Sequence, residues 1–399
     1  MRVRDVQMQP RGDVVRMTAR LTWEDRDHPD DVVWFDWPAE FADSAAAQSN
    51  PALLAAFPLA MLFGERRVAV EGEVCPRLAD GSRTSMAFMA MCKPHLRPPT
   101  LEVNESAAVR TPPTVERRAA LCFSGGVDSL AALRINRQTV PRGHAASFVD
   151  ALYIFGLNTY DFEAGVPVPE RLAVFAAQRE RLERLGEATG LTLITAATNL
   201  RSLYPSWEAW GTVIHVSPHA AVAHGLSQRI RSLGIASAGA GIALEMRPNP
   251  MIDAFNSSHA LDVYTLYPTL SRLDRVRLIA RWPEGLAALR VCFLIDLPDG
   301  GVANCGECEK CVRTKLELLA VGALDGAPFP FADVTPEIID RVSIGSYGSH
   351  LYFAECAPAL ESRGYGDLAR AMRRAMARYE ARQGKPDTKP PWWRRVGRG

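Results

Sequence analysis

The middle of the chain alternates between short apolar runs and longer amphipathic stretches. The runs have the length of buried strands, whereas the stretches repeat apolar residues at helical spacing. Strands that alternate with helices form parallel sheets, so this region predicts an α/β fold with a doubly wound parallel sheet. The predicted strands are 119–123, 151–157, 191–196, 235–238 and 290–295, and the predicted helices are 128–137, 170–188 and 213–233.

The two ends of the chain have other patterns. Short alternating segments before the Pro-rich break at Pro112-Pro113 predict a separate α+β module. Its expected strands are 14–23, 32–37, 67–72 and 101–103, and its expected helices are 51–63 and 82–91. Helical stretches at 314–323, 335–341 and 366–382 follow the α/β region. We therefore expect an α+β module (1–112), an α/β domain (113–325), a helical extension (326–385) and a disordered, Pro- and Arg-rich tail (386–399).

The first predicted strand of the α/β domain ends in Ser-Gly-Gly-Val-Asp-Ser, residues 124–129, and a helix follows at once. Two glycines permit a tight turn, and the unpaired N–H groups of a helix N-terminus attract a phosphate. The hydroxyls of Ser124 and Ser129 add donors. Asp128 is a poor phosphate ligand by itself, which implies either Mg²⁺ or a hydrogen-bonding partner. No lysine follows the glycines, so this is not the P-loop of kinases.

This loop resembles the signature of the PP-loop (N-type) ATP pyrophosphatases. The resemblance implies that ATP is split between its α and β phosphates, with AMP transferred to a carboxyl, amide or carbonyl oxygen. By position it implies ATP and Mg²⁺ at the loop, with Asp128 and Ser129 acting in catalysis. The implied nucleotide-binding loop residues are Ser124, Gly125, Gly126, Val127, Asp128 and Ser129.

Ligands of such sheets bind outside the carboxyl ends of the strands. Gly156 and Asn199 follow the second and third predicted strands, so both are candidate nucleotide contacts. Asp161 has the same placement, although an Asp or Asn in a loop equally often caps its own backbone. His215 and His219 share one face of a predicted helix. His219 could act as an acid or base, but with no carboxylate partner in the sequence pattern a structural histidine is favoured.

The second clear motif is Cys305-x2-Cys308-x2-Cys311, and Cys292 at the end of a predicted strand can supply a fourth thiolate. Four thiolates in a tetrahedral array form a closed structural zinc site. An iron–sulfur cluster is an alternative, although the ferredoxin run continues with x3-Cys-Pro and this chain does not. Redox-active or sulfur-carrying thiols are the third interpretation.

Together the loop and the cysteines resemble 7-cyano-7-deazaguanine synthase and its longer relatives over residues 115–320. In that family the four cysteines hold zinc near the substrate. The synthases have a Ser-Lys-x-Glu-like stretch where this chain has Ser271-Arg272-Leu273-Asp274, so Arg272 is a candidate catalytic contact to phosphate or substrate. The longer gap between Cys292 and Cys305 and the two added modules leave the substrate open.

Composition and charge limit the classes of function that are compatible with these motifs. The formal net charge is +1, which argues against nucleic acid as a partner, and neither a signal peptide nor an 18-residue apolar run is present. We expect a cytoplasmic adenylating enzyme that joins a small-molecule carboxylate to ammonia or an amine, without a membrane. An RNA sulfur-transfer enzyme of the same fold and a non-catalytic nucleotide-binding subunit are the alternatives. A protein partner on the N-terminal module and a homodimer are both compatible with the sequence.

Overall fold

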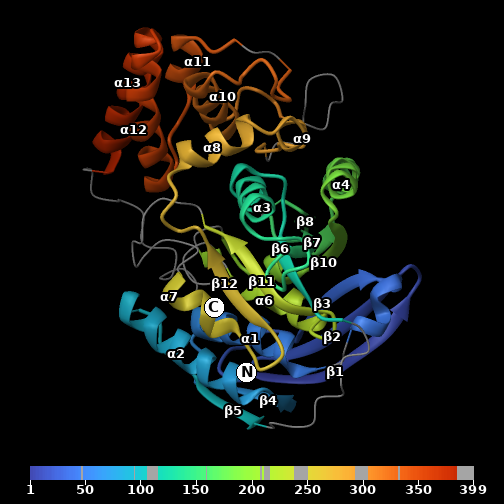
Figure 1. Ribbon diagram of the computed structural model, residues 1–399. Helices are drawn as coiled ribbons and strands as arrows, with labels where there is room; N and C mark the ends of the chain where they lie inside the picture. Colours follow the sequence, from blue (N-terminus) through green and yellow to red (C-terminus); the bar gives the residue numbers. More distant parts are fainter. Residues whose placement is uncertain are drawn as a thin grey trace.

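The computed structural model, drawn as a ribbon in Figure 1, combines strands and helices throughout the chain. The described residues are 1–45, 48–93, 95–105, 116–158, 160–206, 209–210, 216–237, 250–292, 304–330 and 333–383. The strands are β1 (Arg2–Arg11), β2 (Val14–Thr22), β3 (Asp31–Pro38), β4 (Arg67–Val74), β5 (Thr100–Glu105), β6 (Arg118–Cys122), β7 (Phe148–Phe155), β8 (Phe162–Glu163), β9 (Val166–Pro167), β10 (Thr192–Thr198), β11 (Ile230–Ala236) and β12 (Asp262–Leu266). The main helices are α1 (Ser49–Phe63), α2 (Pro76–Cys92), α3 (Val127–Thr139), α4 (Pro169–Thr189), α6 (Ser217–Gly225), α8 (Arg272–Ala280), α9 (Pro283–Ala287), α10 (Glu309–Val321), α11 (Pro336–Arg341), α12 (Tyr347–Ser362) and α13 (Gly366–Gln383).

Ten strands form one mixed sheet in the order β12-β11-β6-β7-β10-β3-β2-β1-β4-β5. The first five of these are parallel to one another. Within this parallel half, the first strand along the chain, β6, lies in the middle. The chain then builds outward through β7 and β10, and returns to place β11 and β12 on the other side of β6. The strand order therefore reverses between β6 and β11, which is where doubly wound sheets bind their ligands.

Helices cover both faces of the parallel half, as Figure 1 shows. Ala119 and Leu121 of β6 pack with α3 and α4, whereas Ala120 between them faces the core that contains α6 and α1. This alternation follows from the two-residue period of a strand. Every residue of α1 except the last is buried, so α1 is a core helix rather than an amphipathic one. The α/β class predicted from the sequence is confirmed at this level.

The sheet continues into the predicted N-terminal module. β3 pairs antiparallel with β10, through Phe35 opposite Thr198 and Asp36 opposite Ala197. The apolar core on the α1 side also contains residues from both halves, including Trp37 and Val222. The predicted strands and helices of this region are confirmed, and β1, which the sequence pattern did not reveal, completes the sheet between β2 and β4.

Several elements of the second half differ from the prediction. The helix expected over 213–233 is wrong beyond Gly225, because α6 ends there and β11 begins at Ile230. Residues 290–292 are not a strand, and the rest of that predicted strand lies outside the described residues, as does His215. Strand β12 and helix α12 were not predicted. β11 lies between β6 and β12, so neighbouring strands rather than local propensity decide its conformation.

The C-terminal helices form a further layer above α3, shown in orange and red in Figure 1. They share an apolar core in which Val312 and Leu316 of α10 pack against Phe353 of α12 and Met372 of α13. Leu273 of α8 belongs to the same core. This layer therefore reaches the α/β half through α8 and α10. The predicted disordered tail, 386–399, lies outside the described residues.

Candidate functional site

The Ser124–Ser129 loop connects β6 to α3 at the point where the strand order reverses. Gly126 is the N-cap of α3. Because glycine has no side chain, no N-cap side chain accepts the first N–H groups of the helix among the described residues. The Ser129 hydroxyl donates to the carbonyl of Gly126 at 3.1 Å, and the Ser124 oxygen accepts the N–H of Gly126 at 3.3 Å. The six predicted loop residues thus form one compact turn whose helix end suits an anion.

Gly125 fixes this turn against its surroundings. Its φ is +74°, and a Cβ at this position would lie 2.4 Å from Nε2 of Gln178 on α4 and 3.2 Å from the carbonyl oxygen of Ala288. The carbonyl of Gly125 accepts the backbone N–H of Arg290 at 2.9 Å. The loop is therefore held between α4 and the segment 288–292, which ends in Cys292.

Asp128 has the hydrogen-bonding partner that its place in the loop implied. Its carboxylate accepts from Nη1 of Arg272 at 3.2 Å and from Nη1 of Arg275 at 3.0 Å. Both arginine side chains are almost completely buried, whereas the Asp128 side chain keeps 30% of its exposure. Nε of Arg272 also donates to Glu317 on α10 at 3.1 Å. One network therefore joins α3, α8 and α10 at the loop.

The buried charges around Asp128 form opposite-charge pairs that favour each other's ionised forms. Burial opposes ionisation of Arg272, but Glu317 and Asp128 outweigh it, so the pKa of this guanidinium lies above its ordinary value. Burial raises the pKa of Glu317, against the effect of Arg272 and Arg313. Lys310, on the first turn of α10, feels both Asp128 and Arg272, and burial together with Arg313 lowers its pKa to about 8. Cations from α8 and α10 thus converge on the N-terminal end of α3.

Gly156 and Asn199 have other local roles. The N–H of Gly156 donates to the carboxylate of Asp161 at 2.9 Å, and the N–H of Asn158 donates to the same oxygen at 3.0 Å. Asp161 therefore caps its own loop, and burial raises its pKa. The Asn199 amide donates to the carbonyl of Val32 at 2.8 Å and accepts from the N–H of Trp34 at 2.9 Å. It ties β3 to the end of β10, so we do not count it among the proposed nucleotide contacts.

One histidine of α6, His224, has a structural contact far from the loop in the sequence. His224 is fully buried, and its Nε2 lies 2.9 Å from the carbonyl oxygen of Asn256. Burial lowers its pKa to about 4, so the ring is neutral and acts as a donor to that carbonyl. His224 is therefore a structural histidine, whereas the role of His219 stays a prediction.

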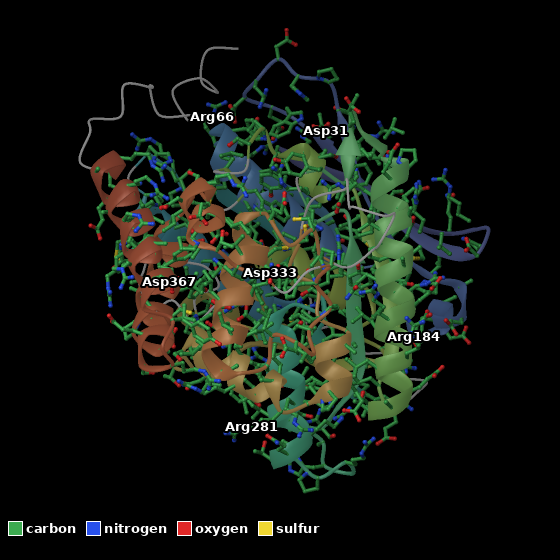
Figure 2. The ribbon with its side chains drawn as sticks, turned by 90° about the horizontal axis from the view of Figure 1, so that it is seen from above. Asp31, Arg66, Arg184, Arg281, Asp333 and Asp367 are labelled. Atoms are coloured by element: carbon green, nitrogen blue, oxygen red, sulfur yellow. The ribbon has the colours of Figure 1, made fainter. Side chains whose placement is uncertain are left out.

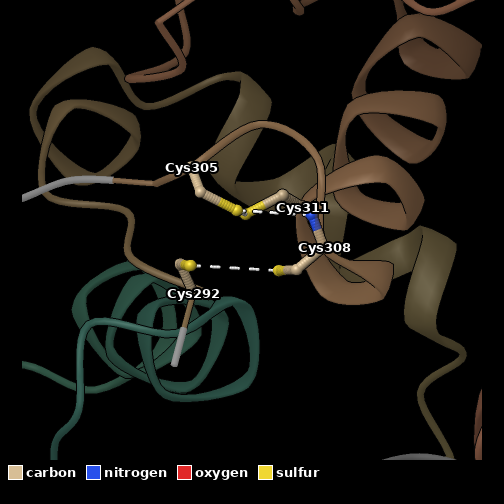
Figure 3. Close-up of side chains that lie close together, drawn as sticks. All are labelled: Cys292, Cys305, Cys308 and Cys311. Atoms are coloured by element: carbon tan, nitrogen blue, oxygen red, sulfur yellow. Dashed lines mark hydrogen bonds between the residues drawn. The ribbon is translucent and has the colours of Figure 1, made fainter. Parts of the chain in front are cut away.

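The four predicted cysteines converge into one cluster, shown in Figure 3. All four sulfur atoms lie within 4.8 Å of one another, with separations of 3.8 Å for Cys305–Cys311 and 3.9 Å for Cys292–Cys308. A tetrahedral ion with metal–sulfur bonds of about 2.3 Å places its sulfurs about 3.8 Å apart. This cluster therefore fits a single metal ion such as zinc, and it is too small for a multi-iron cluster.

The surroundings of the cluster also fit thiolate ligands. Cys305 Sγ accepts the backbone N–H groups of Glu307 at 3.5 Å and Cys308 at 3.3 Å. Lys315, one helical turn after Cys311, is completely buried. Its Nζ donates to the carbonyl of Asp333 at 2.7 Å, and the charges of Asp333, Cys311 and Cys305 act on it. A buried cation beside four thiolates offsets the excess negative charge of a zinc–thiolate centre.

Asn304 connects the metal-binding segment to the loop. Its side-chain oxygen accepts the N–H groups of Val291 at 2.8 Å and Cys292 at 3.2 Å. Its amide nitrogen donates to the carbonyl of Leu289 at 3.1 Å. Because Arg290 in the same segment holds Gly125, a metal bound at the cysteines braces the anion-binding loop from one side.

Sequence reasoning missed the roles of Arg275, Lys310 and Glu317. Arg275 lies one turn after Arg272 on α8, and Lys310, Arg313 and Glu317 recur at helical spacing on α10. This helical spacing of charged residues next to the metal-ligand motif is the sequence pattern that could have predicted the network.

The fold and site define an α/β protein with a glycine-rich turn at a helix N-terminus, beside a cluster of four cysteines that could hold a metal ion. No protein-family model matches the chain, and neither a curated protein nor a solved structure does. Among the helices of the described ranges, none combines the length and apolar character that crossing a bilayer requires.

Proposed function

We propose that this chain is an ATP-dependent, AMP- and pyrophosphate-forming enzyme of the PP-loop type. The observation that carries the proposal is the Ser124–Ser129 loop at the strand-order reversal, where the N-terminus of α3 meets Arg272 and Arg275. Backbone amides and guanidinium groups that converge on one point bind a polyphosphate strongly. The resemblance of this loop to that of ATP pyrophosphatases supplies the nucleotide.

In this proposal the β and γ phosphates of ATP rest on the loop. Ser129 and the first N–H groups of α3 contact phosphate oxygens, while Arg272, Arg275 and Lys310 neutralise them. Mg²⁺ in such sites is held by one or two carboxylates and by the phosphates themselves. Asp128 is the carboxylate that would hold it, and its partial exposure of 30% allows that contact.

The chemistry follows from this placement. A carboxylate oxygen of the substrate attacks the α-phosphorus, the bond to the β-phosphate oxygen breaks, and pyrophosphate leaves. Ammonia or an amine then attacks the acyl carbon and releases AMP, which gives an amide; a second activation of that amide gives a nitrile. The protein contributes by positioning the reactants and by neutralising the charge that develops on pyrophosphate. A 7-deazaguanine-type acid is the first substrate to examine, because the Cys292–Cys311 pattern resembles that of its synthase.

Sulfur transfer to RNA is less well supported. That chemistry needs a reactive thiol at the loop, and Cys122 is the cysteine nearest to it in the sequence. Burial raises the pKa of Cys122 far above its ordinary value, so it stays a protonated thiol.

The experiment is ATP–pyrophosphate exchange by the full chain across a panel of carboxylic acids. Exchange that requires an acid is expected, and Asp128→Asn should lower it about 100-fold, as expected for losing a preorganised electrostatic contact. Asp367→Asn on the exposed side of α13, labelled in Figure 2, is the matched control and should retain full exchange. Absence of exchange with every acid, or equal exchange by Asp128→Asn, would refute the proposal.

A further inference from the structure

One face of α12, in the C-terminal helical layer, carries polar side chains toward the helices beside the Ser124–Ser129 loop. Ser349, Tyr352 and Glu355 recur at three-residue spacing, which places them along one side of α12. The helix packs against α8 and α10, the two helices whose cations surround Asp128 (Figure 1). Each of the three side chains contacts α8 or α10.

The Tyr352 ring contacts two buried guanidinium groups. Its centre lies 5.6 Å from Cζ of Arg272 and 4.8 Å from Cζ of Arg313. Tyr352 is only 9% exposed, and burial, followed by the charge of Asp128, raises the pKa of its hydroxyl. A guanidinium over an aromatic ring is stabilised electrostatically, and the effect is stronger where water is excluded. The ring therefore limits the positions that Arg272 can take beside the loop.

Glu355 fixes the start of the helix from which Arg272 projects. Its Oε1 accepts the backbone N–H of Leu273, the second residue of α8, at 3.1 Å. The first four N–H groups of a helix have no partner within that helix. The Ser271 oxygen accepts the N–H of Asp274 at 3.1 Å, so Ser271 and Glu355 together cap α8. A carboxylate at this end of a helix is also favoured by the helix dipole.

Ser349 extends the same contact to α10. Nη1 of Arg313 donates to the Ser349 hydroxyl at 3.0 Å and to Glu309 at 2.9 Å. Nε of Arg313 lies 3.7 Å from Glu317, the carboxylate that also accepts from Nε of Arg272. α12 therefore contacts both of the arginines with which Glu317 pairs.

We propose that Tyr352 and Glu355 are positioning residues that hold Arg272 in the orientation from which it reaches Asp128 and a bound polyphosphate. This inference rests on the proposed function, since the polyphosphate of ATP is the anion that Arg272 neutralises there. Neither residue touches the nucleotide, because each acts through Arg272. The helical layer that follows the α/β domain in the sequence is then part of the phosphate site as well as a stabilising layer.

The first test observes Arg272 directly and needs no nucleotide. In the full chain with ¹⁵N-labelled arginine, the Nε–Hε signal of Arg272 is the one missing from Arg272→Lys. Tyr352→Leu should shift this signal because the ring is lost, whereas Tyr352→Phe keeps the ring and should retain the position. Nε of Arg229 donates to Asp150 of β7 at 2.9 Å, and its signal should stay in place as a reference. Tyr347→Leu, at a 55% exposed position on the same helix, is the matched control.

The second test measures ATP·Mg²⁺ affinity by calorimetry. Tyr352→Leu should weaken binding about tenfold, as expected for losing one desolvated contact between a cation and a ring, and Tyr352→Phe should stay within about twofold of the parent chain. Glu355→Gln should weaken binding about threefold, because a neutral amide interacts less with the helix dipole. Glu361→Gln, at an exposed position of the same helix, should bind like the parent chain. Metal content should be unchanged in all four variants.

The outcomes separate this inference from the proposed function. An Arg272 signal that stays in place in Tyr352→Leu, or equal losses of affinity in Tyr352→Leu and Tyr352→Phe, would overturn the inference. So would a loss of metal that accompanies the loss of affinity, since the effect would then pass through the cysteines. If Tyr352→Leu does not fold, which the Arg229 signal reports, an unshifted Arg272 signal in Glu355→Gln overturns the inference and a shifted one supports it. Failure of the parent chain to bind ATP·Mg²⁺ would refute the proposed function, while the Arg272 signal still decides whether α12 holds this side chain.

Discussion

Gly125 shows how a single residue sets the shape of the Ser124–Ser129 loop. It combines a left-handed backbone with close contact to Gln178 and Ala288, so a side chain here meets both strain and collision. Other residues pay a conformational penalty at positive φ that glycine avoids. The residue therefore allows the loop to lie against α4 while its amides face outward.

Gly125→Ala should lower the free energy of unfolding by about 1–3 kcal/mol, from backbone strain and the displaced Gln178 side chain. It should also weaken ATP·Mg²⁺ binding, because the turn shifts. Gly143→Ala is the matched control, since a Cβ there meets nothing within 4 Å and its φ is not left-handed. Urea unfolding of both variants checks the prediction, and equal stabilities would contradict it.

His224 makes stability depend on pH. Its pKa is lowered from 6.5 to about 4 in the folded chain, so the unfolded chain binds the proton more readily. Stability is therefore full above about pH 6.5 and is lost as the pH falls toward 4, by about 3 kcal/mol if each pKa unit contributes about 1.4 kcal/mol.

His224→Gln should remove this part of the pH dependence, although it also lowers stability at neutral pH by disturbing a buried site. Urea unfolding at several values between pH 7 and pH 4 measures the slope. The exposed His144→Gln variant should keep the slope of the parent chain. A slope in His224→Gln as steep as that of the parent chain would assign the acid sensitivity to other groups.

At the scale of elements, α10 links the four-cysteine cluster to the proposed phosphate-binding loop. Cys308 is its N-cap and Cys311 lies in its first turn, while Arg313 and Glu317 on the same helix belong to the network around Arg272. A metal ion that fixes the first turn therefore also fixes the position of this network. Metal-dependent ordering of such a helix is common, because ligand binding and folding are coupled.

Cys311→Ser should lower the metal content well below one ion per chain and should weaken ATP·Mg²⁺ binding. Hydrogen exchange over 305–321 should become faster, since the first turn of α10 loses its anchor. Cys92→Ser, which lies outside the four-cysteine cluster, is the control. Elemental analysis with absorption spectroscopy identifies the ion: zinc is colourless, whereas an iron–thiolate site absorbs visible light. A Cys311→Ser chain with normal metal content would refute the assignment.

The elements that the sequence predicted well are those whose signals are local. The apolar run of β6, the glycines and the start of α3 follow one another along the chain, and three of the metal ligands lie within one short motif. Only the last two residues of β11 fall in the predicted strand 235–238. Residues 230–233 continue the predicted helix and become a strand only between β6 and β12. The contact of Asp128 with Arg275 joins residues 147 positions apart, so only the packing of α8 on α3 reveals it.

At the scale of the whole molecule, the two halves of the chain share one sheet and one core. Trp37 of β3 is completely buried, and its ring nitrogen donates to the carbonyl of Val222 on α6 at 3.2 Å. Gly225 at the end of α6 touches the same ring, and a Cβ there would lie 2.1 Å from it. The segment predicted as a separate module therefore packs on the α/β half as tightly as residues within one core do.

Gly225→Ala tests whether the halves unfold together. Forcing a methyl group against Trp37 should cost about 1–3 kcal/mol, as overpacking in a core typically does. If the sheet is one cooperative unit, hydrogen exchange should speed up in β2 and β3 and also in β6 and β7, with a single transition in urea. Gly345→Ala, where a Cβ meets nothing within 4 Å, should leave both halves unchanged. Faster exchange confined to residues 1–105 would instead show that the N-terminal half unfolds as its own unit. In that case β3 would only dock against β10.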